Sequence, residues 1–303
     1  MSFKTVEWQS GKQNFSNHFL SYDQISNKIV YQCSLKDVTI YHHNIVDIFM
    51  YHIENRQGIC ELLYSGGLDS ELVLKFFISQ KIPFKAITLR LIKHDTPINT
   101  HDLYYSEKFC RQNNIKQTFL DLDVDKFYNN YGYINYLDPY KINKFHVATH
   151  YWMIDQCDNF PIMGGEYPWP WENKPIISPL RHSYHCYDHY MQSHNITGIG
   201  NMLGHSLDSI VFFITHHLQH ARNYDKSKLL PSFKEKMYSS IGLGNFEIRQ
   251  RSFGWETIPN YIFDQIMHTD LLTKIYPEPH YSISWESKIA QIIDSTENYN
   301  DIF

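Results

Sequence analysis

The chain has 303 residues, of which 43% are hydrophobic, 16% aromatic and 19% charged. A chain of this length and composition buries a large core, so it is neither a disordered tail nor a small disulfide-dependent scaffold. Its 27 basic and 32 acidic residues give a net charge of −5 with histidine neutral, and partial protonation of its 18 histidines brings that charge closer to zero. No broad basic surface is expected, so nucleic acid is not expected as a partner.

The cysteines and the apolar pattern indicate the compartment. The five cysteines are odd in number, are widely spaced and form no Cys-x-x-Cys pair, which fits free thiols in a reducing compartment. The N-terminus lacks the apolar stretch of a secretory signal, and no run of roughly 18 consecutive apolar residues occurs anywhere. We therefore expect a cytoplasmic protein with no membrane partner.

The predicted elements begin with an alternating run at 27–42, which indicates a strand or hairpin. From residue 44 onward, helical spacing of apolar residues alternates with short apolar runs. The predicted helices are 44–55, 69–80, 102–113 and 143–157, and the predicted strands are 59–64, 84–91, 117–124 and 160–163. This alternation predicts an α/β fold, with a parallel sheet covered by helices on both faces.

The pattern changes after about residue 171, where strand signals fade and helical stretches such as 206–220 and 261–275 dominate. We expect three parts: a small β or irregular segment at 1–43, an α/β domain at 44–171 and a mostly helical C-terminal region at 172–303. Right-handed crossovers would bring the carboxyl ends of the predicted strands to one edge of the sheet, where ligands of such sheets usually bind.

The residues with the clearest chemistry lie between the strand at 59–64 and the helix at 69–80. Gly66 and Gly67 allow the backbone to approach an anion closely, and the hydroxyls of Ser65 and Ser70 can donate to phosphate oxygens. Asp69 would repel a bare polyphosphate, which argues for a Mg²⁺ ion between them. The alternative is a structural turn in which Asp and Ser cap the helix. The strand–helix setting favours the phosphate site.

The SGGLDS sequence at 65–70 resembles the pyrophosphate-binding loop of the ATP pyrophosphatase superfamily, the adenine nucleotide alpha hydrolases. Within it, the chain is most similar to the synthetase domain of asparagine synthetase, through ELLYSGGLDSELVLKFF at 61–77, the helix that follows His101-Asp102, and FPIMGGE at 160–166. The resemblance covers roughly residues 44–170. It implies a parallel sheet with helices on both faces, and cleavage of ATP between its α- and β-phosphates.

Two departures from that family matter. Ser2 stands where its glutamine-hydrolysing half requires cysteine, and that half is missing, which implies that ammonia is not released from glutamine on this chain. The family's aspartate at the later strand end, a Mg²⁺ ligand, is also missing; Glu166 and Glu172 are the candidates to replace it. The resemblance further implies that backbone groups at Leu89 bind adenine, and Glu166 would orient the substrate or act as a base.

The run FEIRQRSFGWE at 246–256 is the candidate partner of the loop. Arg249 and Arg251 alternate, so they point the same way in an extended segment, and a guanidinium there could stabilise departing pyrophosphate. Arg251 is the preferred residue because Gly254 and Trp255 follow it, and an exposed basic face is an equally weighted alternative. Lys174 is a weaker candidate.

For several other groups of residues, a structural role is either favoured over a functional one or weighted equally with it. Two histidine-rich clusters contain enough ligands for zinc, but a chain with 18 histidines produces such clusters by chance. The clusters are His182, His185, Cys186 and His189, and His216, His217 and His220. The acidic residues Asp121, Asp123 and Asp125 are more simply a solvated strand edge than a cation site. The aromatic stretch at 167–171 could line an acceptor pocket or form a rigid loop.

The leading hypothesis is an ATP- and Mg²⁺-dependent, AMP-forming ligase or amidotransferase. It would adenylate a carboxyl or carbonyl substrate, release pyrophosphate, and then release AMP on attack by ammonia or an amine. The alternatives are a non-catalytic nucleotide-binding subunit and a nucleobase-modifying enzyme of the same superfamily. The small-molecule substrate, its nucleophile and a homo-oligomeric state stay open.

Overall fold

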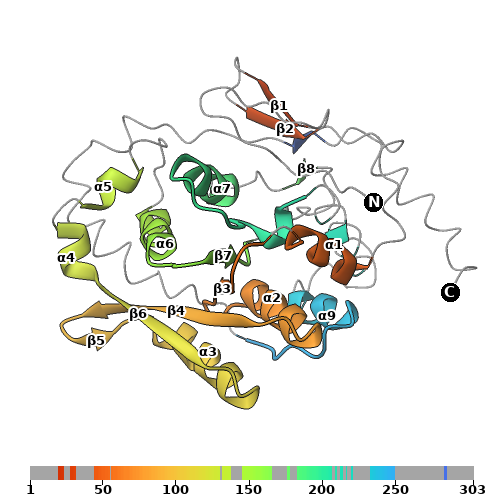
Figure 1. Cartoon of the computed structure of the whole chain (residues 1–303), viewed down its shortest axis with the longest axis horizontal. Coiled ribbons are helices and arrows are strands. Elements are labelled where there is room, and N and C mark those ends of the chain that lie inside the picture. Colours follow the sequence, from red (N-terminus) through yellow and green to blue (C-terminus); the bar gives the residue numbers. More distant parts are fainter. Residues whose placement is uncertain are drawn as a thin grey trace, which may run out of the picture.

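The structure of the chain is a computed structural model (Figure 1). It describes the following residues: 20–23, 28–31, 44–54, 56–129, 132–137, 145–165, 176–177, 183–206, 209, 212–213, 216, 220, 233–249 and 283–284.

A five-stranded sheet forms the centre of the molecule. Its four parallel strands are β3 (Cys60–Leu63), β4 (Phe84–Lys93), β6 (Gln117–Asp123) and β7 (Phe160–Met163), in the spatial order β6-β4-β3-β7. The short strand β5 (Thr96–Pro97) pairs antiparallel with the end of β4. The predicted parallel sheet is confirmed, and each of its four predicted strands begins and ends within two residues of the observed one.

Helices cover both faces of this sheet, as the sequence predicted. Successive strand residues alternate between two buried clusters, so that Leu62 belongs to one and Leu63 to the other. The first cluster includes residues of four helices: α1 (Ile45–His52), α2 (Leu68–Ser79), α3 (Thr100–Gln112) and α9 (Phe233–Ser240). The second includes residues of four others: α4 (Val124–Asn129), α5 (Gly132–Leu137), α6 (Phe145–Asp155) and α7 (Ser183–Ser193). Figure 1 shows α6 and α7 together on one side of the strands.

The connections between the parallel strands reverse direction once. From β3 the chain passes through α2 to β4 and through α3 to β6, stepping each time toward the same edge. From β6 it returns through α6 to β7, on the other side of β3. The carboxyl ends of β3 and β7 therefore flank the point where the topology switches, which is where open α/β sheets place their ligands.

Where its pairing with β3 ends, the edge of β4 is covered by a hairpin and by one side chain. His94 and Asp95 both have positive φ, 47° and 59°, and form the two-residue turn between β4 and β5. Buried Asn99 then accepts a hydrogen bond from the Leu91 N–H (3.0 Å) and donates one to the Leu89 carbonyl (2.9 Å). The amide of Asn99 thus satisfies the backbone groups that a neighbouring strand would otherwise pair with.

Asn99→Ala should leave the Leu91 N–H and the Leu89 carbonyl buried without partners. We expect the free energy of unfolding to fall by about 2–4 kcal/mol, measured by urea denaturation. Asn113→Ala is the matched control, because the Asn113 amide donates to a single helical carbonyl at an exposed position, and a loss below about 1 kcal/mol is expected. Equal losses in the two variants would contradict the role of Asn99.

Outside the sheet and its helices, the structure confirms one predicted element and does not describe another. β1 (Leu20–Asp23) and β2 (Lys28–Tyr31) form an antiparallel hairpin, so the strand predicted within 27–42 is confirmed, with an upstream partner. After residue 172 the described elements are α7, α9, a 3₁₀ helix at Met202–Gly204 and two short paired strands, β8 (Ile176–Ile177) and β9 (Ile283–Ser284). The predicted helix at 261–275 lies outside the described residues.

The three-part division of the chain stays a prediction. The described residues of the C-terminal region do contribute to the first buried cluster, through Met202, Leu203, Phe213 and Met237 among others. Among the helices that the structure describes, none is long and apolar enough to cross a bilayer.

Candidate functional site

The glycine turn lies at the switch point of the sheet. β3 ends at Leu63, and α2 begins at Leu68 with Gly67 as its N-cap. Gly66 has φ +83°, and a Cβ atom added to it would lie 2.3 Å from the carbonyl oxygen of Asp102. A Cβ on Gly164, which follows β7, would lie 2.8 Å from the Ser70 backbone nitrogen. Both glycines are therefore required by close backbone approach, at the place where the sequence predicted a phosphate loop.

The first turn of α2 presents backbone donors to this place. As the N-cap residue, Gly67 has no side chain that could accept a hydrogen bond from the first turn of α2. The serine hydroxyls bond within the turn: Ser65 Oγ lies 3.1 Å from Ser70 Oγ and accepts from the Gly67 N–H at 3.2 Å, while Ser70 Oγ donates to the Gly67 carbonyl at 3.0 Å. The turn is thus held in shape while the helix start keeps its partial positive charge.

Asp69 is bound by two side chains of helix α9. The ammonium group of Lys234 and the hydroxyl of Tyr238, one helical turn apart, both donate to its carboxylate. Lys234 is only 10% exposed and Asp69 only 20% exposed. An ammonium group therefore neutralises the carboxylate that the sequence assigned to Mg²⁺. Among the residues that the structure describes, no group of three or more His, Cys, Asp or Glu is arranged to hold a metal ion.

Arg249 also contacts this turn. Its guanidinium donates to the Gly66 carbonyl and to the Glu71 carboxylate, and lies 4.6 Å from the centre of the Tyr105 ring. Arg249 is 7% exposed and Glu71 is 2% exposed, and burial lowers the pKa of the arginine. Glu71 also pairs with Lys75 at 3.1 Å. Buried charges of this kind are stable only when paired, so the turn and the segment at 243–249 hold each other in place.

The structure describes one of the two alternating arginines, Arg249. Arg251, the preferred residue, lies outside the described residues, as does Glu166. Arg249 contacts the loop, whereas the sequence analysis preferred its neighbour Arg251, whose role stays a prediction. Alternation finds both arginines, but it does not tell which of them is buried against Glu71. Lys234 and Tyr238 were missed altogether, and no motif in the sequence marks them.

The other candidates are also located where the structure describes them. The side chain of Leu89 is buried in the second cluster and its carbonyl accepts from Asn99, so a base would have to share that carbonyl. His216 bonds to the Phe212 carbonyl (3.0 Å) and His220 to Ser240 (2.8 Å), which agrees with structural roles. The side chains of His185, Cys186 and His189, and all of His182, lie outside the described residues.

Two of the three acidic candidates, Asp121 and Asp123, have structural partners, whereas Asp125 lies 3.4 Å from His94 and has one buried oxygen with no hydrogen-bond partner among the described residues. Asp121 forms a two-pronged pair with Arg90, at 2.5 and 2.7 Å, and Asp123 accepts from the Lys126 N–H at the start of α4. These contacts agree with the favoured interpretation of a strand edge and give no support to a cation site there.

Gly66→Ala should destabilise the protein strongly, because the new Cβ would collide with the Asp102 carbonyl. Gly242→Ala is a matched control: Gly242 has nearly the same φ, +87°, but a Cβ there meets nothing within 4 Å. We expect about 1 kcal/mol lost at Gly242, from φ alone, and at least about 2 kcal/mol more at Gly66. Chemical denaturation measures both, and equal losses would show that the close approach at Gly66 is unimportant.

Comparisons with known proteins give little beyond the fold. No protein-family model matches the chain, and no curated protein matches its sequence. One similar solved structure is described as a predicted subunit of tRNA methyltransferase, from Methanocaldococcus jannaschii. It shares 15% sequence identity, with 64% of this chain and 94% of that chain covered and a TM-score of 0.33. A likeness at that level carries no argument about activity.

Proposed function

We propose that the chain binds ATP with its polyphosphate tail at the glycine turn, and that it is an AMP-forming enzyme that adenylates a carboxyl or carbonyl substrate. The observation that carries the proposal is the turn itself: an uncapped helix start at the switch point, shaped by two glycines and flanked by Lys234 and Arg249. Backbone N–H groups, a helix dipole and nearby cations are the features that bind phosphates.

The residues present fit a polyphosphate if one exchange takes place. Lys234 binds Asp69 in the first turn of α2 and would turn from it to a phosphate oxygen. Asp69 would then accept Mg²⁺, an ion that commonly uses one or two carboxylates, phosphate oxygens and water. The ion would supply charge neutralisation of the phosphates. Arg249 would stay on the Gly66 carbonyl and keep the turn in shape, which makes it a positioning residue.

The proposed chemistry uses positioning and charge. A substrate oxygen attacks the α-phosphorus, the bond to the β-phosphate breaks, and the negative charge that develops on the pyrophosphate is met by the helix start and Lys234. Glu166 is proposed to orient the substrate or act as its base, and Arg251 to offset charge on the leaving group. Ammonia or an amine then displaces AMP, as the sequence resemblance implies.

Lys234→Met should weaken ATP binding by about tenfold or more, because the ammonium group that is proposed to bind a phosphate oxygen is lost. Equilibrium dialysis with labelled ATP and Mg²⁺ measures this. Lys236→Met is the matched control, because Lys236 lies on the same helix at an exposed position. Near-wild-type affinity in Lys234→Met, with both variants folded by circular dichroism, would contradict binding at the turn.

The reaction type is tested by the products. ATP labelled at the α-phosphate, incubated with the protein, Mg²⁺ and a mixture of small carboxylic acids and amines, should yield labelled AMP and an equal amount of pyrophosphate. Formation of ADP would refute cleavage at the α-phosphate.

A second candidate is a nucleotide-binding subunit without turnover, and the occupation of Asp69 by Lys234 and Tyr238 is the observation that favours it. An Asp69 that keeps these partners in the nucleotide complex would be unable to take Mg²⁺. Tight ATP binding with no AMP formed across many substrates would identify this function.

A further inference from the structure

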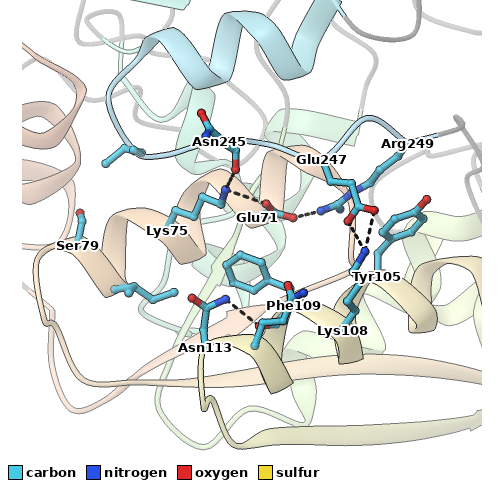
Figure 2. A pocket seen from close by; sticks show the side chains of 13 residues that line it. Glu71, Lys75, Ser79, Tyr105, Lys108, Phe109, Asn113, Asn245, Glu247 and Arg249 are labelled. Carbon is cyan, nitrogen blue, oxygen red and sulfur yellow. Dashed lines mark hydrogen bonds and ion pairs between the residues drawn. The ribbon is translucent and has the colours of Figure 1, made fainter.

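A cavity lies between α2, α3 and the segment 243–249 and has a volume of about 430 Å³ (Figure 2). That volume falls within the range of small-molecule sites. The charged and aromatic side chains in its wall come from all three segments: Glu71, Lys75, Tyr105, Lys108, Phe109, Glu247 and Arg249. None of the functions considered above uses this cavity.

The wall carries more positive than negative charge. Three cations, Lys75, Lys108 and Arg249, face two carboxylates, those of Glu71 and Glu247. Arg249 is 93% buried, and its guanidinium interacts with the hydroxyl of buried Tyr64 as well as with Gly66 and Glu71. A wall with excess positive charge favours an anionic ligand.

The two lysines differ in how accessible they are. Burial against the Phe246 ring, whose centre lies 3.9 Å from its Nζ, lowers the pKa of Lys75 to about 8, and this lysine also donates to the Asn245 carbonyl. Lys108 instead lies at the mouth, 32% exposed, and binds both oxygens of the half-exposed Glu247 at 2.7 and 2.8 Å. Figure 2 shows this pair beside Tyr105.

The ammonium group of Lys108 binds the carboxylate of Glu247 as it would bind the carboxylate of a ligand. An ion pair this exposed contributes about 1 kcal/mol or less, so another carboxylate can replace Glu247 at low cost. The rings of Tyr105 and Phe109 provide apolar contact for the hydrocarbon part of such a ligand. The chain's own glutamate thus occupies the position that a ligand carboxylate would take.

Glu247 lies two residues before Arg249, whose guanidinium binds the Gly66 carbonyl. We propose that the cavity binds a small carboxylate of about amino-acid size, which replaces Glu247 on Lys108, and that its binding is transmitted through Arg249 to the glycine turn. The site goes beyond the proposed function, since it requires no nucleotide.

Benzoate, acetate and succinate are the probes, titrated separately into the full chain without nucleotide, at ionic strength held constant with sodium chloride. We expect saturable binding of benzoate in the millimolar range by saturation-transfer NMR. Lys108→Gln should weaken it at least about fivefold, whereas Glu247→Gln should tighten it about two- to fivefold, because the competing carboxylate is gone. Lys116→Gln, at an exposed position just after α3, is the matched control and should bind benzoate as the wild type does.

Two results would overturn the site: no saturable binding of any of the three probes up to about 20 mM, or benzoate binding that is unchanged in both Lys108→Gln and Glu247→Gln. The link to the turn has its own readout, the amide shift of Gly66 in ¹⁵N-glycine-labelled protein. That signal should move on benzoate binding in the wild type and stay still in Lys108→Gln. A stationary Gly66 signal in benzoate-saturated wild type would refute the transmission. Neither readout depends on ATP, so a failure here is distinct from a failure of nucleotide binding.

Discussion

The pairing of buried charges between the first turn of α2 and the C-terminal part of the chain fixes the geometry on which the site depends. Asp69 and Glu71 stand near a helix N-terminus, where carboxylates are favourable, but both are largely removed from water. Each is therefore stable only with a cation at hand, and Lys234 and Arg249 provide one each. Without these partners, the cost of burying two carboxylates at one turn would favour a more open loop.

The same pairing explains why the C-terminal region packs where it does. Helix α9 presents Lys234 and Tyr238 on one face to Asp69, while Phe233 and Met237 enter the buried cluster beneath. Apolar burial supplies most of the stability and is not directional, so it leaves the rotation of α9 loosely specified. The ion pair is directional, and it selects the rotation that brings an ammonium group to the helix start.

The sequence predicted the sheet well because each of its signals is local. The strand at 160–163 and the loop at 65–70 are marked by short apolar runs followed at once by glycines, and the pattern needs no distant residue. The short helices α4 and α5 were not predicted, because six residues are too few for a helical period to be distinguished from a loop. Asn99, which replaces a strand neighbour of β4, is equally invisible, because its role depends on the hairpin that brings it back to Leu89.

The site was predicted only as far as the turn. Lys234 meets Asp69 across 165 residues of chain, and Arg249 meets Gly66 across 183. Contacts at such separations leave no periodicity in one sequence, and a lysine in a polar helix looks the same whether it is exposed or buried. The glycine and tryptophan that led to the preference for Arg251 indicate a positioned loop but carry no information about which arginine faces Glu71, and the role of Arg251 stays a prediction.

Charge balance at the turn is the physical reason why the proposed function includes a divalent ion. Lys234 already pairs with Asp69 and Arg249 with Glu71, so both cations are engaged before a polyphosphate binds. If Lys234 moved to a phosphate and no other cation took its place, the carboxylate of Asp69 would be left unpaired, close to Glu71 and to the phosphates. The repulsion would cancel the free energy gained by the contact of Lys234 with the phosphate. In the proposed function, a Mg²⁺ ion shared by Asp69 and the phosphates would remove that conflict. In the proposed function, the ammonium group would serve as the counterion of Asp69 until the nucleotide and the divalent ion bind, and nucleotide affinity should depend steeply on the divalent ion because the exchange needs both.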